Sequence, residues 1–119
     1  MEQADIEFFK EQLSLQLDQL RGKAASTVSS LLNSGNRHSD PLDRASFDLD
    51  QTTLLRIRDR ESRLILKVVE ALNRIKEGTF GICDECEEEI GLLRMMARPV
   101  ATLCIRCKTR MENEEKKFG

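Results

Sequence analysis

Four cysteines form the most informative chemical pattern in the chain. They fall in two pairs, Cys83-Asp84-Glu85-Cys86 and Cys104-Ile105-Arg106-Cys107, with seventeen residues between the pairs. A two-residue gap lets both thiolates of a pair face one point, and a long loop brings the second pair round to complete a tetrahedron. The spacing therefore predicts one structural Zn²⁺ with Cys83, Cys86, Cys104 and Cys107 as its ligands. Four protein ligands leave no open position for water, which disfavours a catalytic zinc.

The alternative interpretation of the cysteines is two redox thiol pairs or disulfides. A thioredoxin-like site would need one CxxC on a βαβ unit, which this sequence lacks. Many zinc knuckles carry Gly after the second Cys, whereas Glu87 stands there in this chain, so we expect Gly81 and Gly91 to supply the flexible backbone. Four thiolates and one Zn²⁺ carry a net charge of about -2 by ligand counting. Bases close in sequence that offset this charge are Arg94, Arg98, Arg106 and Lys108.

Composition limits what the rest of the chain can do. The 119 residues include 34% charged and 4% aromatic residues, so a large apolar core is not expected, and small chains often need a metal, disulfides or a partner to hold their shape. The net charge of -2 argues against a protein that coats DNA. The N-terminus does not resemble a signal peptide and no apolar run reaches membrane-spanning length, so we expect a cytoplasmic protein without membrane contact. We also expect the protein to be a monomer.

A long helix is predicted over residues 4–33, because apolar or small side chains recur at steps of three and four. The stripe repeats every eleven residues, which favours a nearly straight helix seam. Its members are Ile6, Phe9, Leu13, Leu17, Leu20, Ala24, Val28 and Leu31.

A second helix is predicted over residues 41–77, after a polar turn at 33–39. Asp40 is a suitable N-cap, Pro41 suits the first helical position and Gly78 suits the C-cap. The predicted stripe is interrupted by the polar Glu61 and consists of Phe47, Leu54, Ile57, Leu64, Val68, Ala71 or Leu72, and Ile75.

The predicted fold is mainly α. Residues 1–77 would form a long antiparallel two-helix coiled-coil hairpin with its tip at about 35–45. Residues 78–119 would form a small four-Cys zinc-ribbon domain that ends in a helix over 105–117. Residues 52–77 carry seven bases and four acids, and we interpret most of those bases as a solvated face, with the rim of a protein interface as the alternative.

Two carboxylates, Asp40 and Asp43, lie at the predicted tip. Helix capping explains both, since Asp40 suits the N-cap and Asp43 suits the positive end of the helix. They would also be able to approach a metal ion or basic side chains of a partner. His38 is the only histidine, and no nucleophile-base set or phosphate-binding Gly loop is present, so the chain is not expected to be an enzyme.

The sequence resembles the DksA/TraR family of bacterial transcription factors from about residue 2 to the end. The resemblance is carried by Asp40-Pro41-Leu42-Asp43-Arg44-Ala45, by the phrase ARPVATLCIRCK and by the four-cysteine pattern. It implies a regulator that binds RNA polymerase and inserts its hairpin into the secondary channel. The tip residues Asp40, Asp43 and Ala45 would then act near the catalytic centre and destabilise open promoter complexes.

The resemblance also implies a binding site for the alarmone ppGpp at the interface with polymerase. The family positions for that site fall on Leu64, Lys67, Arg98 and Lys108, and all four carry the expected residue type. Arg and Lys are the usual partners of phosphates. Longer family members carry an additional N-terminal segment that this sequence does not include.

Three other functions remain open at this point. A secondary-channel factor for transcript cleavage or antipausing would also place acids at a hairpin tip. A zinc ribbon that binds nucleic acid directly is disfavoured by the near-neutral charge and scarce aromatics. A thiol-based redox sensor would release zinc on oxidation.

Overall fold

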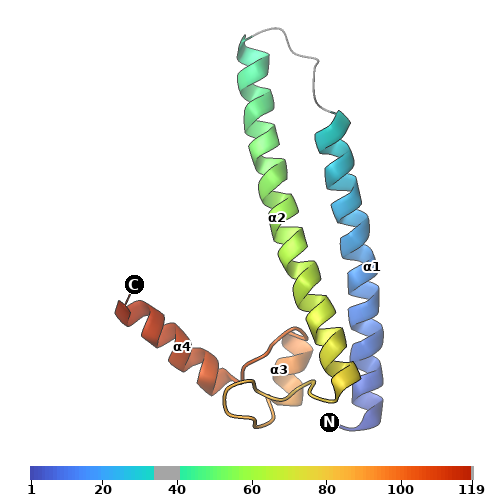
Figure 1. Ribbon diagram of the computed structural model, residues 1–119, viewed down its shortest axis with the longest axis vertical. Coiled ribbons are helices and arrows are strands. Elements are labelled where there is room, and N and C mark those ends of the chain that lie inside the picture. Colours follow the sequence, from blue (N-terminus) through green and yellow to red (C-terminus); the bar gives the residue numbers. More distant parts are fainter. Residues whose placement is uncertain (34–40, 119) are drawn as a thin grey trace. The chain divides into compact units, whose positions relative to one another are not determined.

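The computed structural model describes residues 1–33 and 41–118 and contains four helices in this part of the chain (Figure 1). They are α1, Gln3–Asn33; α2, Pro41–Glu77; α3, Leu92–Ala97; and α4, Ile105–Phe118. The predicted helices over 4–33, 41–77 and 105–117 are confirmed to within a residue. The short helix α3 was not predicted, and Asp40 lies outside the described residues.

The chain divides into two compact units. Unit 1 comprises Met1–Ser14 and Val68–Gly119, and unit 2 comprises Leu15–Lys67. This grouping differs from a division at residue 77, because the first turns of α1 and the last turns of α2 pack with the cysteine-containing segment. None of the described helices is both long and apolar enough to cross a membrane.

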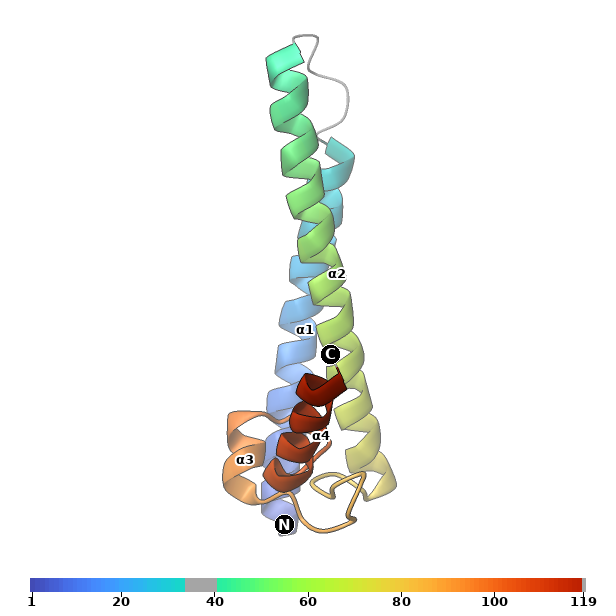
Figure 2. The ribbon, with the colours of Figure 1, turned by 90° about the vertical axis from the view of Figure 1, so that its left-hand side faces the viewer.

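Unit 2 consists of two antiparallel helical arms that lie side by side (Figures 1 and 2). On α1 the residues turned inward are Leu17, Leu20, Ala24, Thr27 and Leu31, all buried or half-buried. Their steps of three, four, three and four follow the seven-residue repeat of a coiled coil. The predicted eleven-residue repeat therefore fails at Val28, whereas Leu31, its other member beyond Ala24, is half-buried as predicted. Val28 was predicted to be buried but is 37% exposed, and Thr27 takes its place.

The polar pair of Thr27 and Glu61 explains this shift. The Thr27 hydroxyl oxygen lies 3.1 Å from Glu61 Oε1 and 3.0 Å from the carbonyl oxygen of Lys23. A hydroxyl has one proton, so these two acceptors share it. Glu61 stands in the predicted stripe of α2, and a polar residue of that arm requires a polar neighbour on the other. Ile57 was predicted in the same stripe but is 40% exposed, so the apolar packing of α2 is thinner there.

Unit 1 has a small core that several short segments share. The most buried large side chains are Phe9 and Leu13 of α1, Val68 of α2 and Met95 of α3. The rings of Phe9 and Phe80 lie 5.3 Å apart between centroids. These contacts place the start of α1 and the end of α2 against the segment that carries the cysteines.

A glycine ends α2 and turns the chain toward the first cysteine pair. Gly78 has a φ of 82°. The amide of Gly78 donates to the carbonyl of Ile75 at 3.3 Å, and that of Thr79 donates to Arg74 at 2.9 Å. This pair of bonds is a Schellman motif, in which a left-handed glycine satisfies the last free carbonyls of a helix.

Replacement of Thr27 tests the polar pair in unit 2. Thr27→Val should lower the free energy of unfolding by about 1 kcal/mol, because the part-buried Glu61 carboxylate loses its donor. The double variant Thr27→Val/Glu61→Leu should recover at least that loss, since an apolar pair of similar size needs no hydrogen bond. Urea unfolding followed by circular dichroism at constant zinc measures both. The exposed neighbour Ser26 provides the control Ser26→Ala, and a Thr27→Val variant as stable as this control would contradict the interpretation.

Candidate metal centre

The four cysteine side chains converge in unit 1. The Sγ atoms of Cys83, Cys86, Cys104 and Cys107 all lie within 4.8 Å of one another. Sulfur ligands at the usual zinc distance of about 2.3 Å stand about 3.8 Å apart along the edges of a tetrahedron. The Cys86 and Cys104 sulfurs are 3.8 Å apart, and none of the four is in a disulfide. The donor set and its spacing thus fit one Zn²⁺, and the predicted zinc-binding site is confirmed.

The four ligands differ in their access to solvent. Cys83 and Cys107 are buried, Cys104 is half-buried and Cys86 is exposed. Burial of two ligands shields one side of the site from water, and the closed set of four sulfurs leaves no position for a substrate. The arrangement is that of a structural zinc site, which contributes to folding directly.

Backbone hydrogen bonds shape the first cysteine pair. The Cys83 amide donates to the Glu88 carbonyl at 2.8 Å, and the Glu87 amide donates to the Cys83 carbonyl at 3.0 Å. An isolated antiparallel bridge joins Ile82 and Glu89 just outside this turn. The Asp84 amide donates to the Thr102 carbonyl at 2.9 Å. This last bond ties the first pair to the loop that leads into the second pair.

Glu87 occupies the position at which many zinc knuckles have glycine, and it adopts the backbone that glycine favours. Its φ is 61°, in the left-handed region, while Gly81 and Gly91 have φ of 82° and 104°. Gly81 and Gly91 do adopt positive φ, but the expectation that they replace the backbone role of position 87 is wrong, because Glu87 adopts it itself. Glu87 keeps the knuckle turn at a cost of about 1–2 kcal/mol relative to an unstrained residue.

Arg74 anchors the first cysteine pair to α2. Its guanidinium donates to both carboxylate oxygens of Asp84, at 2.9 Å and 2.7 Å. The hydrogen bond from Arg74 holds the pKa of Asp84 below its usual range. Both side chains remain partly exposed, so solvent screening limits the pair to about 1 kcal/mol or less. Arg74 is one of the seven bases of residues 52–77 that were interpreted as a solvated face, and its partner is ten residues away in the sequence.

The backbone around Cys83 favours its metal-binding form. Burial acts to raise the thiol pKa, but hydrogen bonds from the backbone of Cys86, Cys104 and Glu85 outweigh it and lower the pKa to about 6. The thiolate is the form that binds zinc, so these backbone contacts favour metal binding. The second pair adds a similar contact, because the Cys107 amide lies 3.5 Å from the Cys104 sulfur.

The four bases near the cysteines differ in their surroundings. Arg94 Nε donates to the Leu103 carbonyl at 3.0 Å, so it braces the loop before the second pair. Lys108 Nζ lies 4.0 Å from a Glu112 oxygen on α4. Arg106 lines a hollow with Arg110 beside Cys86, Cys104 and Cys107, which suits the offsetting charge predicted for it. Arg98 follows α3 and is exposed.

The residues of the predicted tip and ppGpp site are distributed over both units. Asp43 and Ala45 lie in the first turns of α2. Leu64 is half-buried and Lys67 exposed in unit 2, whereas Arg98 and Lys108 belong to unit 1. The roles of the tip and the convergence of these four residues stay predictions.

Removal of the metal or of a buried ligand should unfold much of unit 1. We expect one zinc per chain by elemental analysis, and Cys83→Ser or prolonged chelation should abolish the dispersed amide resonances of residues 78–110. The physical reason is that so small a core needs the metal to order it. The helical signal of Leu15–Lys67 should persist and serves as the internal control. A chelated protein with unchanged resonances would show that the fold of unit 1 does not depend on zinc.

Replacement of Glu87 by glycine should stabilise unit 1. Glu87→Gly removes the left-handed strain, and after the greater flexibility of unfolded glycine is counted the gain should be about 0.5–1 kcal/mol. Glu87→Ala removes the same charge but keeps the strain, so it is the matched control. Denaturant midpoints of both variants at fixed zinc give the comparison, and equal midpoints would refute the account.

Two family models match the chain. The model described as the N-terminal domain of DnaK suppressor protein DksA matches residues 5–75. The model described as the prokaryotic dksA/traR C4-type zinc finger matches residues 78–113, the segment that holds all four cysteines.

Named relatives and solved structures agree with these models. The RNA polymerase-binding transcription factor DksA of Caulobacter vibrioides is 38% identical to this chain, and the match covers 98% of this chain and 82% of the relative. The protein of the same name from Escherichia coli K12 is also 38% identical, and the match covers 100% of this chain and 79% of the relative. The structure of transcription factor DksA2 from Pseudomonas aeruginosa matches with a TM-score of 0.89 at 38% identity, covering 98% of this chain and 89% of that one. A Chlamydia trachomatis polymerase-binding protein, 23% identical with a TM-score of 0.58, supports the fold alone. The chain thus belongs to the DksA family and carries its C4-type zinc finger.

Proposed function

We propose that this protein is a bacterial transcription regulator that binds RNA polymerase and modulates initiation. The observation that carries the proposal is the match of hairpin and zinc finger together, over nearly the whole chain, to relatives named as RNA polymerase-binding transcription factors. On this proposal the protein acts without catalysis of its own and works as a monomer in the cytoplasm, without sequence-specific DNA contact or membrane contact.

The hairpin would enter the secondary channel of polymerase with its tip foremost. Asp43 and Ala45 belong to the first turns of α2, whose helical backbone fixes their spacing. Carboxylates at the start of a helix are favoured by its positive end, so a charged tip and a stable helix are compatible. Asp40, Asp43 and Ala45 would then act near the catalytic centre, where carboxylates reach metal ions or basic side chains.

Residues of both units would supply a second function, the response to ppGpp. Lys67, Arg98 and Lys108 are cations that suit phosphates, and Leu64 would add an apolar contact. Lys67 and Arg98 are exposed, as a site completed by a partner requires. Regulation of ribosomal RNA and other stringent-response promoters would follow from this site.

The tip is tested by multi-round transcription from a ribosomal RNA promoter with the cognate polymerase. The wild-type protein should inhibit, and Asp43→Asn should lose most of the inhibition while it competes for polymerase as well as the wild type. Asp50→Asn, an exposed acid on the same helix, is the matched control and should inhibit normally. Full activity of Asp43→Asn would count against a functional tip, and stimulated transcript cleavage in stalled complexes would favour the cleavage-factor alternative.

The same assay separates the alarmone site from the tip. Added ppGpp should deepen inhibition by the wild type, and Lys67→Ala or Arg98→Ala should remove this increment without changing inhibition in its absence. Arg58→Ala, an exposed base of the same arm, serves as the control. If added ppGpp does not change the inhibition, the proposed ppGpp site is contradicted, whereas the proposed mechanism of the tip is not.

A further inference from the structure

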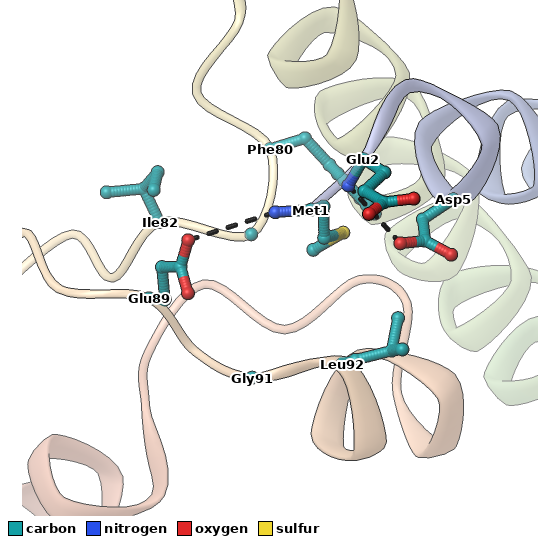
Figure 3. A pocket seen from close by; sticks show the side chains of 9 residues that line it. Met1, Glu2, Asp5, Phe80, Ile82, Glu89, Gly91 and Leu92 are labelled. Atoms are coloured by element: carbon teal, nitrogen blue, oxygen red, sulfur yellow. Dashed lines mark hydrogen bonds and ion pairs between the residues drawn. The ribbon is translucent and has the colours of Figure 1, made fainter.

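A pocket of about 420 Å³ in unit 1 plays no part in the zinc site or the proposed tip mechanism. Its apolar walls include Phe80, Ile82 and Leu92, and its rim carries Glu2, Asp5 and Glu89. Figure 3 shows Met1 between Glu89 on one side and Glu2 and Asp5 on the other. The volume lies within the range of pockets that accept a ligand or an anchoring side chain.

The residues that line this pocket carry mainly negative charge. Of the described residues that line it, three carry carboxylates and none is Lys or Arg. The Met1 amine lies 3.8 Å from a Glu89 oxygen, and the Glu2 amide donates to Asp5 at 3.3 Å. One amine does not neutralise three carboxylates, and the side chain of Glu89 is 76% exposed. The rim therefore attracts cations and repels phosphates and anionic membranes.

The pocket continues into an apolar face on α3. Leu92 belongs to both, and Leu93 and Met96 lie beside it at helical spacing. These three side chains are 42%, 84% and 56% exposed, whereas Met95 of the same helix is fully buried. A six-residue helix that buries one methionine and exposes three large apolar side chains is unusual for a surface that meets only water.

We propose that the pocket and the α3 face together dock a segment of a protein partner in which apolar side chains are flanked by Lys or Arg. The apolar anchor would fill the pocket between Phe80, Ile82 and Leu92, and the flanking bases would pair with Glu89 and Asp5. This contact uses no residue of the hairpin tip, and Arg98, one of the bases assigned to ppGpp, directly follows the α3 face. It would give unit 1 a docking role of its own.

Nuclear magnetic resonance titration of the zinc-loaded ¹⁵N-labelled protein tests this proposal. The probe is a short acetylated and amidated peptide with two leucines four positions apart among lysines. Saturable shifts are expected at the amides of Gly81, Ile82, Glu89 and Gly91, with none at Ala24 or Thr27 of unit 2. A peptide with Asn in place of Leu and another with Glu in place of Lys should both fail to saturate these shifts.

Charge reversal on the rim supplies the second measurement. Glu89→Lys should weaken binding of the lysine-leucine peptide by roughly fivefold. Glu114→Lys, the same change at an exposed site on α4, should leave it unchanged. Unchanged zinc content and resonance dispersion would show that both variants are folded, so that a change in peptide binding does not result from unfolding. Equal weakening by the two variants, binding of the glutamate peptide, or no saturable shift with any peptide would overturn the proposal, whatever the transcription assay shows.

Discussion

Four sulfur atoms held within 4.8 Å of one another set the requirement that the rest of unit 1 has to meet. As thiolates they repel, so the arrangement is stable only with a cation among them. The backbone contacts of Cys83, the bond from Asp84 to Thr102 and the Arg74 anchor all reduce the freedom of the two pairs before the metal arrives. With a core as small as that around Phe9 and Met95, the zinc supplies order that apolar packing alone does not.

Much of this arrangement could be predicted from the sequence because its signals are local. The two CxxC pairs specify the ligands by spacing alone, and the absence of Pro and the three-four steps specify α1. Pro41 and Gly78 mark the ends of α2, each through a backbone property that other residues lack. Such features are fixed by a few neighbouring residues, and distant contacts do not overrule them.

The features that were predicted wrongly or not at all depend on contacts between residues that are distant in the sequence. Val28 is the better apolar residue, yet Thr27 is buried because Glu61 on the other arm needs a donor. Arg74 was interpreted as a solvated base, but its guanidinium donates to the carboxylate of Asp84. The helix α3 is too short for a periodic pattern, and Met95 is buried there through tertiary packing. Glu87 shows that a required left-handed turn does not always recruit glycine.

The contact between Phe9 and Phe80 has a consequence for synthesis of the chain. Phe9 emerges from the ribosome long before Phe80, and the cysteines of the second pair emerge later still. During that interval the first turns of α1 expose Phe9 and Leu13 without the residues that later bury them. Unit 1 therefore closes only after the second cysteine pair has emerged, when metal capture and apolar burial become possible together. The nascent chain is most exposed to aggregation and to chaperones before that moment.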